Sequence, residues 1–217
     1  MIISRGRRYI FVHIPKTGGT ALTLALEGRA MKEDLIIADT PKGRARAGRL
    51  KGIRANGRLW KHSTLADIEG LVSPEEMAGF FTFALVRNPW DRMVSLYHFL
   101  RGQSFGHPMV LAAKHHDFTG FLQSEVTRRL VPTGHYASYM RGSDGREHAR
   151  LFARIEHLDT DLAPFEAHLG FRLTPLPRVN ASDRQRDWRP YYTATDAELV
   201  SQLCADDIAR FGYCFEP

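Results

Sequence analysis

The stretch formed by residues 9–22 constrains the fold of this chain more strongly than any other part of its sequence. Residues 9–14 (YIFVHI) are apolar and rich in β-branched and aromatic side chains, which is typical of a buried strand. Residues 15–19 (PKTGG) form a turn, because proline fixes one backbone dihedral and glycine adopts conformations that other residues avoid. From Thr20 onward the sequence TALTLALE consists largely of strong helix formers. The pattern predicts a strand, a turn and a helix in direct succession.

This succession is also the pattern of an anion site. Backbone N–H groups converge at such a turn, the helix dipole adds positive potential, and Lys16 adds a full charge. The nucleotide-triphosphate loop reads G-x-x-x-x-G-K-[ST], with lysine after the glycines. Lys16 precedes Gly18 and Gly19, so that motif is absent. The stretch predicts a site for phosphate or sulfate, and an ordinary tight turn is the alternative.

A second strand-to-helix junction follows residues 80–86 (FFTFALV), a continuous apolar run that predicts a central buried strand. The next residues are RNPWDRMVSLY, in which Pro89 stands where a helix can start. Arg87 lies at the end of the strand, and Ser95 lies two turns into the helix. Ligands of open parallel sheets bind outside the carboxyl ends of the strands. Two such junctions suit a ligand with two phosphate-like ends.

Both motifs resemble those of sulfotransferases that use 3′-phosphoadenosine 5′-phosphosulfate (PAPS). The sequence PKTGGT resembles their 5′-phosphosulfate loop, and R-x-P-x-x-R-x-x-S-x-Y resembles their 3′-phosphate motif. Residues 207–215 (DIARFGYCF) resemble the closing signature of the carbohydrate-type, family 2 members. The resemblance is weak over residues 102–150 and does not include the basic residues 41–61.

The resemblance implies a set of site residues. Those implied to bind the 5′-phosphosulfate are Lys16, Thr17, Gly18, Gly19 and Thr20. Arg87 and Ser95 are implied to hold the 3′-phosphate. A basic residue before the last helix is implied to cover the nucleotide, with Arg184 the first candidate and a solvated loop arginine the alternative. Lys16 is also expected to neutralise charge on the leaving 5′-phosphate.

The general base is predicted to be His62. An acceptor hydroxyl must lose its proton as it attacks sulfur, and an unperturbed imidazole has a pKa of about 6.5, close to the working pH. Residues 59–60 (LW) are expected to end a strand, and a short helix is expected from Ser63 or Thr64, so His62 should project from the same sheet edge as Lys16. A Lys-His pair resembles the catalytic position of family 2 members. A histidine that caps a strand end is the alternative, with Glu156 or His13 next in line as base.

The remaining elements are predicted from local patterns. Ser73, Pro74 and Glu76 predict a capped helix start, and Thr195 with Glu198 predicts another. Residues 151–155 predict a third central strand, followed by one helix to about Gly170. Together these elements predict a single α/β domain over residues 1–217, with a mostly parallel central sheet, helices on both faces and a P-loop-like sulfotransferase fold.

Charge and composition narrow the partners. The chain has 217 residues, a formal charge of +6 and an isoelectric point near 9.5, which favours anionic partners. Residues 41–61 contain no acid and form either a mobile surface loop or a basic surface for an anionic acceptor or the cofactor. Nucleic acid is disfavoured, because no aromatic residue is interleaved before Trp60. The cations of this basic segment are Lys42, Arg44, Arg46, Arg49, Lys51, Arg54, Arg58 and Lys61.

Location and metal content are expected from similar reasoning. The two cysteines form no disulfide framework or metal pattern, and no signal peptide or membrane span is visible. Animal members of the family that this chain resembles carry a Golgi membrane anchor, so the resemblance implies a cytoplasmic, bacterial-type member without stable membrane insertion. No metal is expected either, since the adjacent residues of the cluster His115, His116 and Asp117 do not share a helix face.

The predicted function is transfer of a sulfuryl group from PAPS to a hydroxyl, with a carbohydrate acceptor implied by the resemblance. Two alternatives stay open: a nucleotide-dependent kinase or phosphotransferase on a related loop fold, and a non-catalytic protein that binds polyanions. ATP and magnesium dependence would mark the first alternative, and absence of turnover the second. The acceptor, the position sulfated and the oligomeric state are not defined by the sequence.

Overall fold

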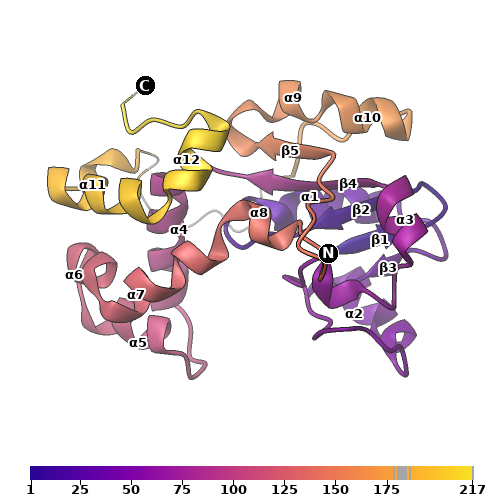
Figure 1. The fold of residues 1–217 in the computed structure, drawn as a ribbon, viewed down its shortest axis with the longest axis horizontal. Helices are drawn as coiled ribbons and strands as arrows, with labels where there is room; N and C mark the ends of the chain where they lie inside the picture. Colours follow the sequence, from indigo (N-terminus) through magenta and orange to yellow (C-terminus); the bar gives the residue numbers. More distant parts are fainter. Residues whose placement is uncertain (178, 180–184, 186, 217) are drawn as a thin grey trace. The chain divides into compact units, whose positions relative to one another are not determined.

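The computed structural model describes residues 1–177, 179, 185 and 187–216 (Figure 1). The chain divides into two compact units. The first unit comprises Met1–Val86 and Ala137–Asn180, and the second comprises Arg87–Tyr136 and Ala181–Pro217. The first unit contains the whole sheet, whereas the regular structure described in the second unit is helical.

Five strands form one mixed sheet in the order β3-β1-β2-β4-β5 (Figure 1). Strands β2, β4 and β5 run parallel, whereas β1 is antiparallel to both β2 and β3. A short turn joins β1 to β2, and such a connection permits only antiparallel pairing. The predicted α/β class is confirmed, with the parallel part of the sheet limited to three strands. The bounds are β1 Ile2–Ser4, β2 Tyr9–Val12, β3 Leu35–Ile36, β4 Phe81–Val86 and β5 Leu151–Arg154.

Both faces of the sheet are covered, which explains the unbroken apolar runs of β2 and β4. On one face Phe11 and Phe83 pack in a single cluster with Leu22 and Leu26 of α1 (Gly19–Gly28) and Phe165 of α10 (Ala163–Leu169). Alternate strand residues point to the opposite face. These are also buried: Ile10, Val12, Thr82, Ala84 and Val86.

The basic segment, residues 41–61, begins with regular structure. Helix α2 (Pro41–Arg46) starts there because Thr40 accepts a hydrogen bond from Gly43 N at 3.2 Å, and η1 (Ala47–Leu50) follows. The strand expected at residues 59–60 is absent, since this stretch is irregular in the structure. Ser63 Oγ bonds the carbonyls of Arg58 and Trp60 instead, which closes a turn. The short helix expected next is the 3₁₀ turn η2 (Ala66–Ile68).

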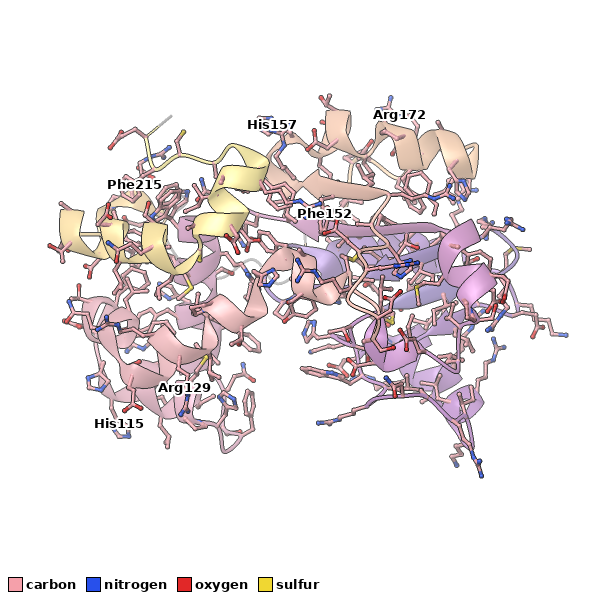
Figure 2. All side chains as sticks on the ribbon, in the orientation of Figure 1. His115, Arg129, Phe152, His157, Arg172 and Phe215 are labelled. Carbon is pink, nitrogen blue, oxygen red and sulfur yellow. The ribbon has the colours of Figure 1, made fainter. Side chains whose placement is uncertain are left out.

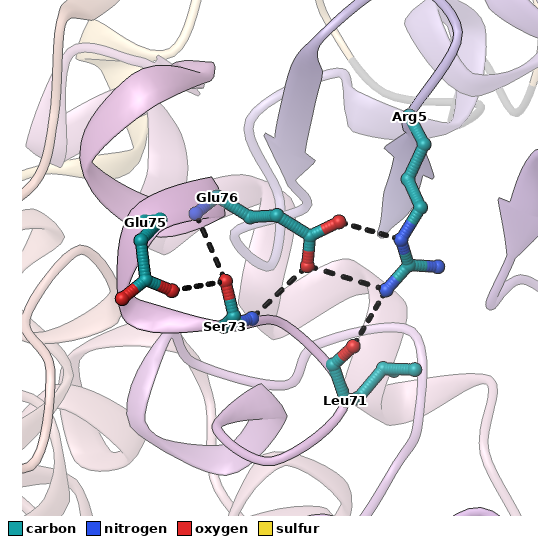
Figure 3. Close-up of polar contacts among 5 residues, drawn as sticks. All are labelled: Arg5, Leu71, Ser73, Glu75 and Glu76. Carbon is teal, nitrogen blue, oxygen red and sulfur yellow. Dashed lines mark hydrogen bonds and ion pairs between the residues drawn. The ribbon is translucent and has the colours of Figure 1, made fainter.

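Helix α3 (Pro74–Gly79) has the predicted capping box (Figure 3). Ser73 Oγ accepts from Glu76 N at 3.2 Å, and the Glu76 carboxylate accepts from Ser73 N at 3.0 Å. The same carboxylate binds Arg5, which follows β1, at 2.6 Å. Arg5 also donates to the carbonyl of Leu71 at 2.7 Å, so one arginine ties the helix start to the sheet.

The structure of residues 151–169 differs from the prediction in two places. Strand β5, which carries Phe152 (Figure 2), lies at an edge of the sheet and is not a central strand. The single helix expected after it is divided into η4 (Ile155–His157), α9 (Leu158–Asp161) and α10. Pro164 has no amide hydrogen and lies in the first turn of α10, where no such hydrogen is needed, so the helices are divided before it.

The second unit has its own apolar core around α4 (Pro89–Arg101). Trp90, Val94 and Tyr97 of α4 pack with Phe121 and with Val200. The expected cap at Thr195 is wrong, because Thr193 and Asp196 form a capping box two residues earlier. The other elements of this unit are α5 (Pro108–His115), α6 (Phe118–Gln123), α7 (Glu125–Leu130), η3 (Pro132–Gly134), η5 (Arg189–Tyr191), α11 (Ala194–Leu203) and α12 (Ala205–Phe211). Helix α8 (Tyr136–Tyr139) begins in this unit and ends in the first.

Across the described residues of both units, no helix has the length and apolar character needed to cross a bilayer.

Candidate active site

The turn between β2 and α1 has the backbone geometry of an anion site. Lys16 and Gly18 both adopt left-handed conformations, with φ of 66° and 81°. Gly18 is the N-cap residue of α1 and has no side chain with which to bond the amides of the first helical turn. These amides and the positive end of the helix dipole can therefore serve a phosphate or sulfate group.

Both glycines lie close against neighbouring side chains. A Cβ atom on Gly18 would lie 2.3 Å from Cδ1 of Ile155, and one on Gly19 would lie 2.1 Å from Cδ2 of His13. The His13 ring thus packs directly on the backbone of the turn. A larger residue at position 19 would displace this ring.

The threonine hydroxyls of the turn serve the backbone. Thr17 is fully buried, and its hydroxyl donates to the carbonyl of Ile14 at 2.9 Å. Thr23 in the same way donates to Gly19 O at 2.7 Å. Thr17 can therefore offer an anion its backbone amide, while its hydroxyl holds the turn in shape.

The structure places His62 next to the carboxyl end of β2. Its Nδ1 atom lies 2.7 Å from the backbone oxygen of His13. A carbonyl can only accept, so Nδ1 carries the hydrogen and Nε2 holds the lone pair. The rings of His13 and His62 pack edge to face with centroids 4.7 Å apart, and Trp60 packs on His62 at 5.0 Å.

Burial keeps both histidines neutral. Burial lowers the pKa of His62 to about 4; the charge of Lys61 adds to this effect, and the hydrogen bond to His13 opposes it. Burial also lowers the pKa of His13, with the charges of Lys61 and Lys16 contributing. At neutral pH, His62 is therefore in the form that can accept a proton.

A cavity of about 290 Å³ lies beside the first turns of α1. Its wall includes His13, Thr20, Asp39 and Lys61. Lys61 Nζ lies 2.6 Å from Asp39 Oδ2, and this contact lowers the pKa of Asp39. A hydroxyl-bearing molecule in the cavity would meet polar side chains from three segments of the first unit.

The second junction belongs to the second unit and is built differently. The Asn88 side chain caps α4 by accepting from Trp90 N at 3.1 Å and from Asp91 N at 3.5 Å. Arg87 Nε donates to Asp91 Oδ2 at 2.7 Å, and a terminal nitrogen of Arg87 lies 2.6 Å from the same oxygen. Ser95 is buried on α4.

The predicted residues thus fall into two groups. The residues of the turn and His62 lie together at the end of β2, and Arg87 and Ser95 lie at the start of α4. Arg184 lies outside the described residues. Sequence reasoning missed Asp39, which no local pattern marks. It considered His13 as an alternative base, whereas the structure shows that the backbone oxygen of His13 orients His62.

The cluster of His115, His116 and Asp117, at which no metal is expected, lies where α5 ends and α6 begins. In the described part of the chain, no group of three His, Cys, Asp or Glu side chains is arranged to hold a metal ion. His115 ends α5 and is exposed (Figure 2).

Comparison with known proteins defines the class. Residues 1–214 match the model of a sulfotransferase family. Among solved structures, the fold is similar to that of mouse sulfotransferase SULT7A1 complexed with PAP (3′-phosphoadenosine 5′-phosphate), with a TM-score of 0.57 and 17% sequence identity. The match covers 98% of this chain and 89% of the mouse chain. No curated protein sequence matches the chain.

The chain therefore belongs to the sulfotransferase family. This result confirms the resemblance seen in the two motifs. It also confirms the predicted enzyme class, a sulfotransferase.

Proposed function

We propose that this sulfotransferase transfers the sulfuryl group of PAPS to a hydroxyl of a carbohydrate, and that the turn after β2 binds the reacting end of the donor. Lys16 and the amides of residues 17–20 bind the 5′-phosphosulfate. Arg87 and Ser95 bind the 3′-phosphate. The main support is the left-handed Gly18 N-cap, which leaves the first amides of α1 to an anion.

The reaction exchanges one sulfur–oxygen bond and moves one proton. The acceptor oxygen bonds to sulfur while the bond between sulfur and the bridging phosphate oxygen breaks, and 3′-phosphoadenosine 5′-phosphate (PAP) leaves. His62 Nε2 takes the hydroxyl proton, because His62 Nδ1 donates to His13 O. Lys16 neutralises the charge that develops on the leaving phosphate.

Donor binding changes the strength of this base. In the free protein the pKa of His62 is about 4, lower than is ideal for a general base at neutral pH. A phosphosulfate group bound at the nearby turn favours the imidazolium ion and raises this pKa. The donor thus prepares the base for the acceptor.

The basic segment supports a carbohydrate acceptor with acidic groups. Within its described residues, only Lys61 forms an ion pair with an acid. Trp60 is 43% exposed, and its ring lies 5.6 Å from the Arg58 guanidinium and 5.0 Å from the His62 ring. A sugar ring can stack on the exposed indole, while the cations attract carboxylate or sulfate groups.

Transfer of radiolabelled sulfuryl groups from PAPS tests the proposal. Pools of acidic and neutral polysaccharides are offered with and without EDTA, and we expect EDTA-resistant labelling of the acidic pool. Trp60→Ala should reduce labelling, whereas Arg129→Ala on α7 (Figure 2) removes an exposed cation of the second unit and should not. Absence of labelling on every hydroxyl acceptor contradicts the proposal. Labelling of the neutral pool alone contradicts the preference for acidic groups.

A further inference from the structure

We propose that Tyr136 is a positioning residue that fixes the peptide groups on both sides of Arg87, so that this arginine recognises the 3′-phosphate of the donor. The inference rests on the proposed role of Arg87. Tyr136 and Arg87 both belong to the second unit and are 49 residues apart in the sequence.

One hydroxyl group bonds both peptide groups. The Tyr136 hydroxyl donates to Arg87 O at 2.5 Å and accepts from Arg87 N at 3.3 Å. A phenolic oxygen can donate and accept at the same time. Arg87 lies after the last residue of β4 and before the Asn88 cap, in a short irregular segment between a strand and a helix. The hydroxyl therefore holds the peptide groups on both sides of Arg87 at once.

Tyr136 itself is held on several sides. It is fully buried, and its backbone N donates to the two carboxylate oxygens of Asp207 at 2.9 and 3.2 Å. The Arg92 guanidinium lies 4.7 Å from its ring centroid, and the Phe211 ring packs on it at 5.8 Å. A side chain fixed by α4 and α12 can impose a fixed position on a short irregular segment.

The position of the Arg87 backbone matters for phosphate recognition. The Arg87 guanidinium is already oriented at its far end by Asp91, at 2.6 Å. The Tyr136 hydroxyl fixes the other end of the same residue. An arginine held at both ends binds phosphate without losing further side-chain entropy, which favours ligands that carry the 3′-phosphate.

The test is Tyr136→Phe, which removes the hydroxyl and retains the buried ring. Calorimetry measures the dissociation constants of PAP and of adenosine 5′-phosphate, which lacks the 3′-phosphate. We expect the dissociation constant of PAP to rise about 5- to 30-fold, because the variant loses the two hydrogen bonds of the hydroxyl. The dissociation constant of adenosine 5′-phosphate should change less than about twofold. The KM for PAPS should rise, while kcat at saturating PAPS stays near that of the wild type.

Tyr97→Phe is the matched control. Tyr97 is a buried tyrosine of the same unit, and its hydroxyl donates to the carbonyl of His116 at 3.0 Å. This variant loses the same kind of bond but does not touch Arg87. We expect its preference for PAP over adenosine 5′-phosphate to equal that of the wild type.

Arg87→Ala separates failure of this inference from failure of the proposed function. If Arg87→Ala abolishes the preference for PAP and Tyr136→Phe retains it, the role of Tyr136 is wrong and that of Arg87 stands. If both variants retain the preference, both roles are wrong. Amide hydrogen exchange gives a second measurement: the Arg87 amide should exchange faster in Tyr136→Phe than in Tyr97→Phe, and equal rates contradict the proposal.

Discussion

The two strand-to-helix junctions offer an anion different chemistry. After β2 the helix cap is Gly18 and Lys16 has a left-handed backbone, so the backbone itself forms the site. After β4 the Asn88 side chain occupies the first amides of α4. In the proposed function, recognition at the second junction therefore depends on side chains, namely Arg87 and Ser95. A backbone site suits the group that reacts, and a side-chain site suits a group that only identifies the donor.

The difference extends to the surroundings of each junction. The first junction is lined by the buried His13 and the half-buried His62, and the pKa values of both are lowered. The second is lined by the ion pair of Arg87 with Asp91. Perturbed titratable groups at a turn with a strained residue are typical of the reacting end of a site. Substitutions at the first junction should therefore affect turnover, and those at the second should affect affinity.

The largest effect is expected from His62→Ala. Loss of a positioned general base should lower turnover about 10²- to 10⁴-fold. The affinity for PAP should change less than about twofold, because His62 does not contribute to donor binding in this scheme. Steady-state kinetics and calorimetry measure the two quantities. A variant with near-normal turnover would assign the base elsewhere, with Glu156 or His13 the next candidates.

Lys16→Gly should separate activity from stability. Removal of the cation that stabilises the leaving phosphate should lower turnover about 10²- to 10³-fold. Glycine has no penalty at a φ of 66°, where a lysine costs about 1–2 kcal/mol. The greater freedom of glycine in the unfolded chain offsets part of this gain. Thermal unfolding should therefore show equal or slightly higher stability, and a clear loss of stability would contradict the assignment of strain.

The pH dependence should report on His62. Its pKa of about 4 in the folded protein lies below the unfolded value of about 6.5, so protonation favours unfolding. Stability from this group is complete above pH 6.5 and is lost as the pH falls toward 4, by up to about 3 kcal/mol. Urea titrations of the wild type and of His62→Gln at several pH values measure this contribution.

The same histidine should give two different acid limbs in the rate profiles. The acid limb of kcat/KM for PAPS reports the pKa of His62 in the free enzyme and should lie near pH 4. The acid limb of kcat reports the pKa of His62 in the enzyme–substrate complex. It should lie at a higher pH, because the bound donor raises the pKa of His62. Coincident limbs would show that the donor does not act on this base.

Arg87→Ala should weaken affinity with less effect on chemistry. Loss of a charged hydrogen-bond donor should weaken PAP binding by about 1.5–3 kcal/mol. Adenosine 5′-phosphate should be little affected, since it has no 3′-phosphate. Equal affinity of the wild-type protein for the two ligands would contradict the role of Arg87 from the start.

The sequence predicted those elements whose start is decided by local chemistry. The capping box of Ser73 and Glu76 and the proline at position 89 begin helices as expected. Prediction failed where a competing local pattern was stronger. Thr193 with Asp196 replaces the expected pair at Thr195, because both members of the earlier pair can bond the opposite backbone.

The site was predicted only as far as its residues are adjacent in the sequence. The turn after β2 and the Lys61–His62 pair are local features, and motif chemistry indicates them. The contacts of His62 with His13 and of Tyr136 with Arg87 join residues 49 positions apart. No local pattern predicts these contacts, because they arise from tertiary packing between segments that are far apart in the sequence.

Asn88→Ala should give the smallest effect and tests the comparison directly. Loss of an N-cap costs about 1 kcal/mol of stability. Asp117→Ala is the matched control, because Asp117 caps α6 by accepting from Gly120 N at 2.8 Å and lies in the same unit. We expect similar shifts of the urea midpoint in both variants.

Affinity for PAP then tests how the second junction binds phosphate. Asn88→Ala leaves the amides of Trp90 and Asp91 without their side-chain cap, as at the first junction. If side chains alone recognise the 3′-phosphate, the PAP dissociation constant should stay within about twofold of that of Asp117→Ala, because the Asn88 cap contributes to helix stability and not to recognition. Tighter binding of PAP by Asn88→Ala would show that a phosphate at this junction also uses the helix amides. Both junctions would then use helix amides to bind an anion, and the second would use them to a smaller extent.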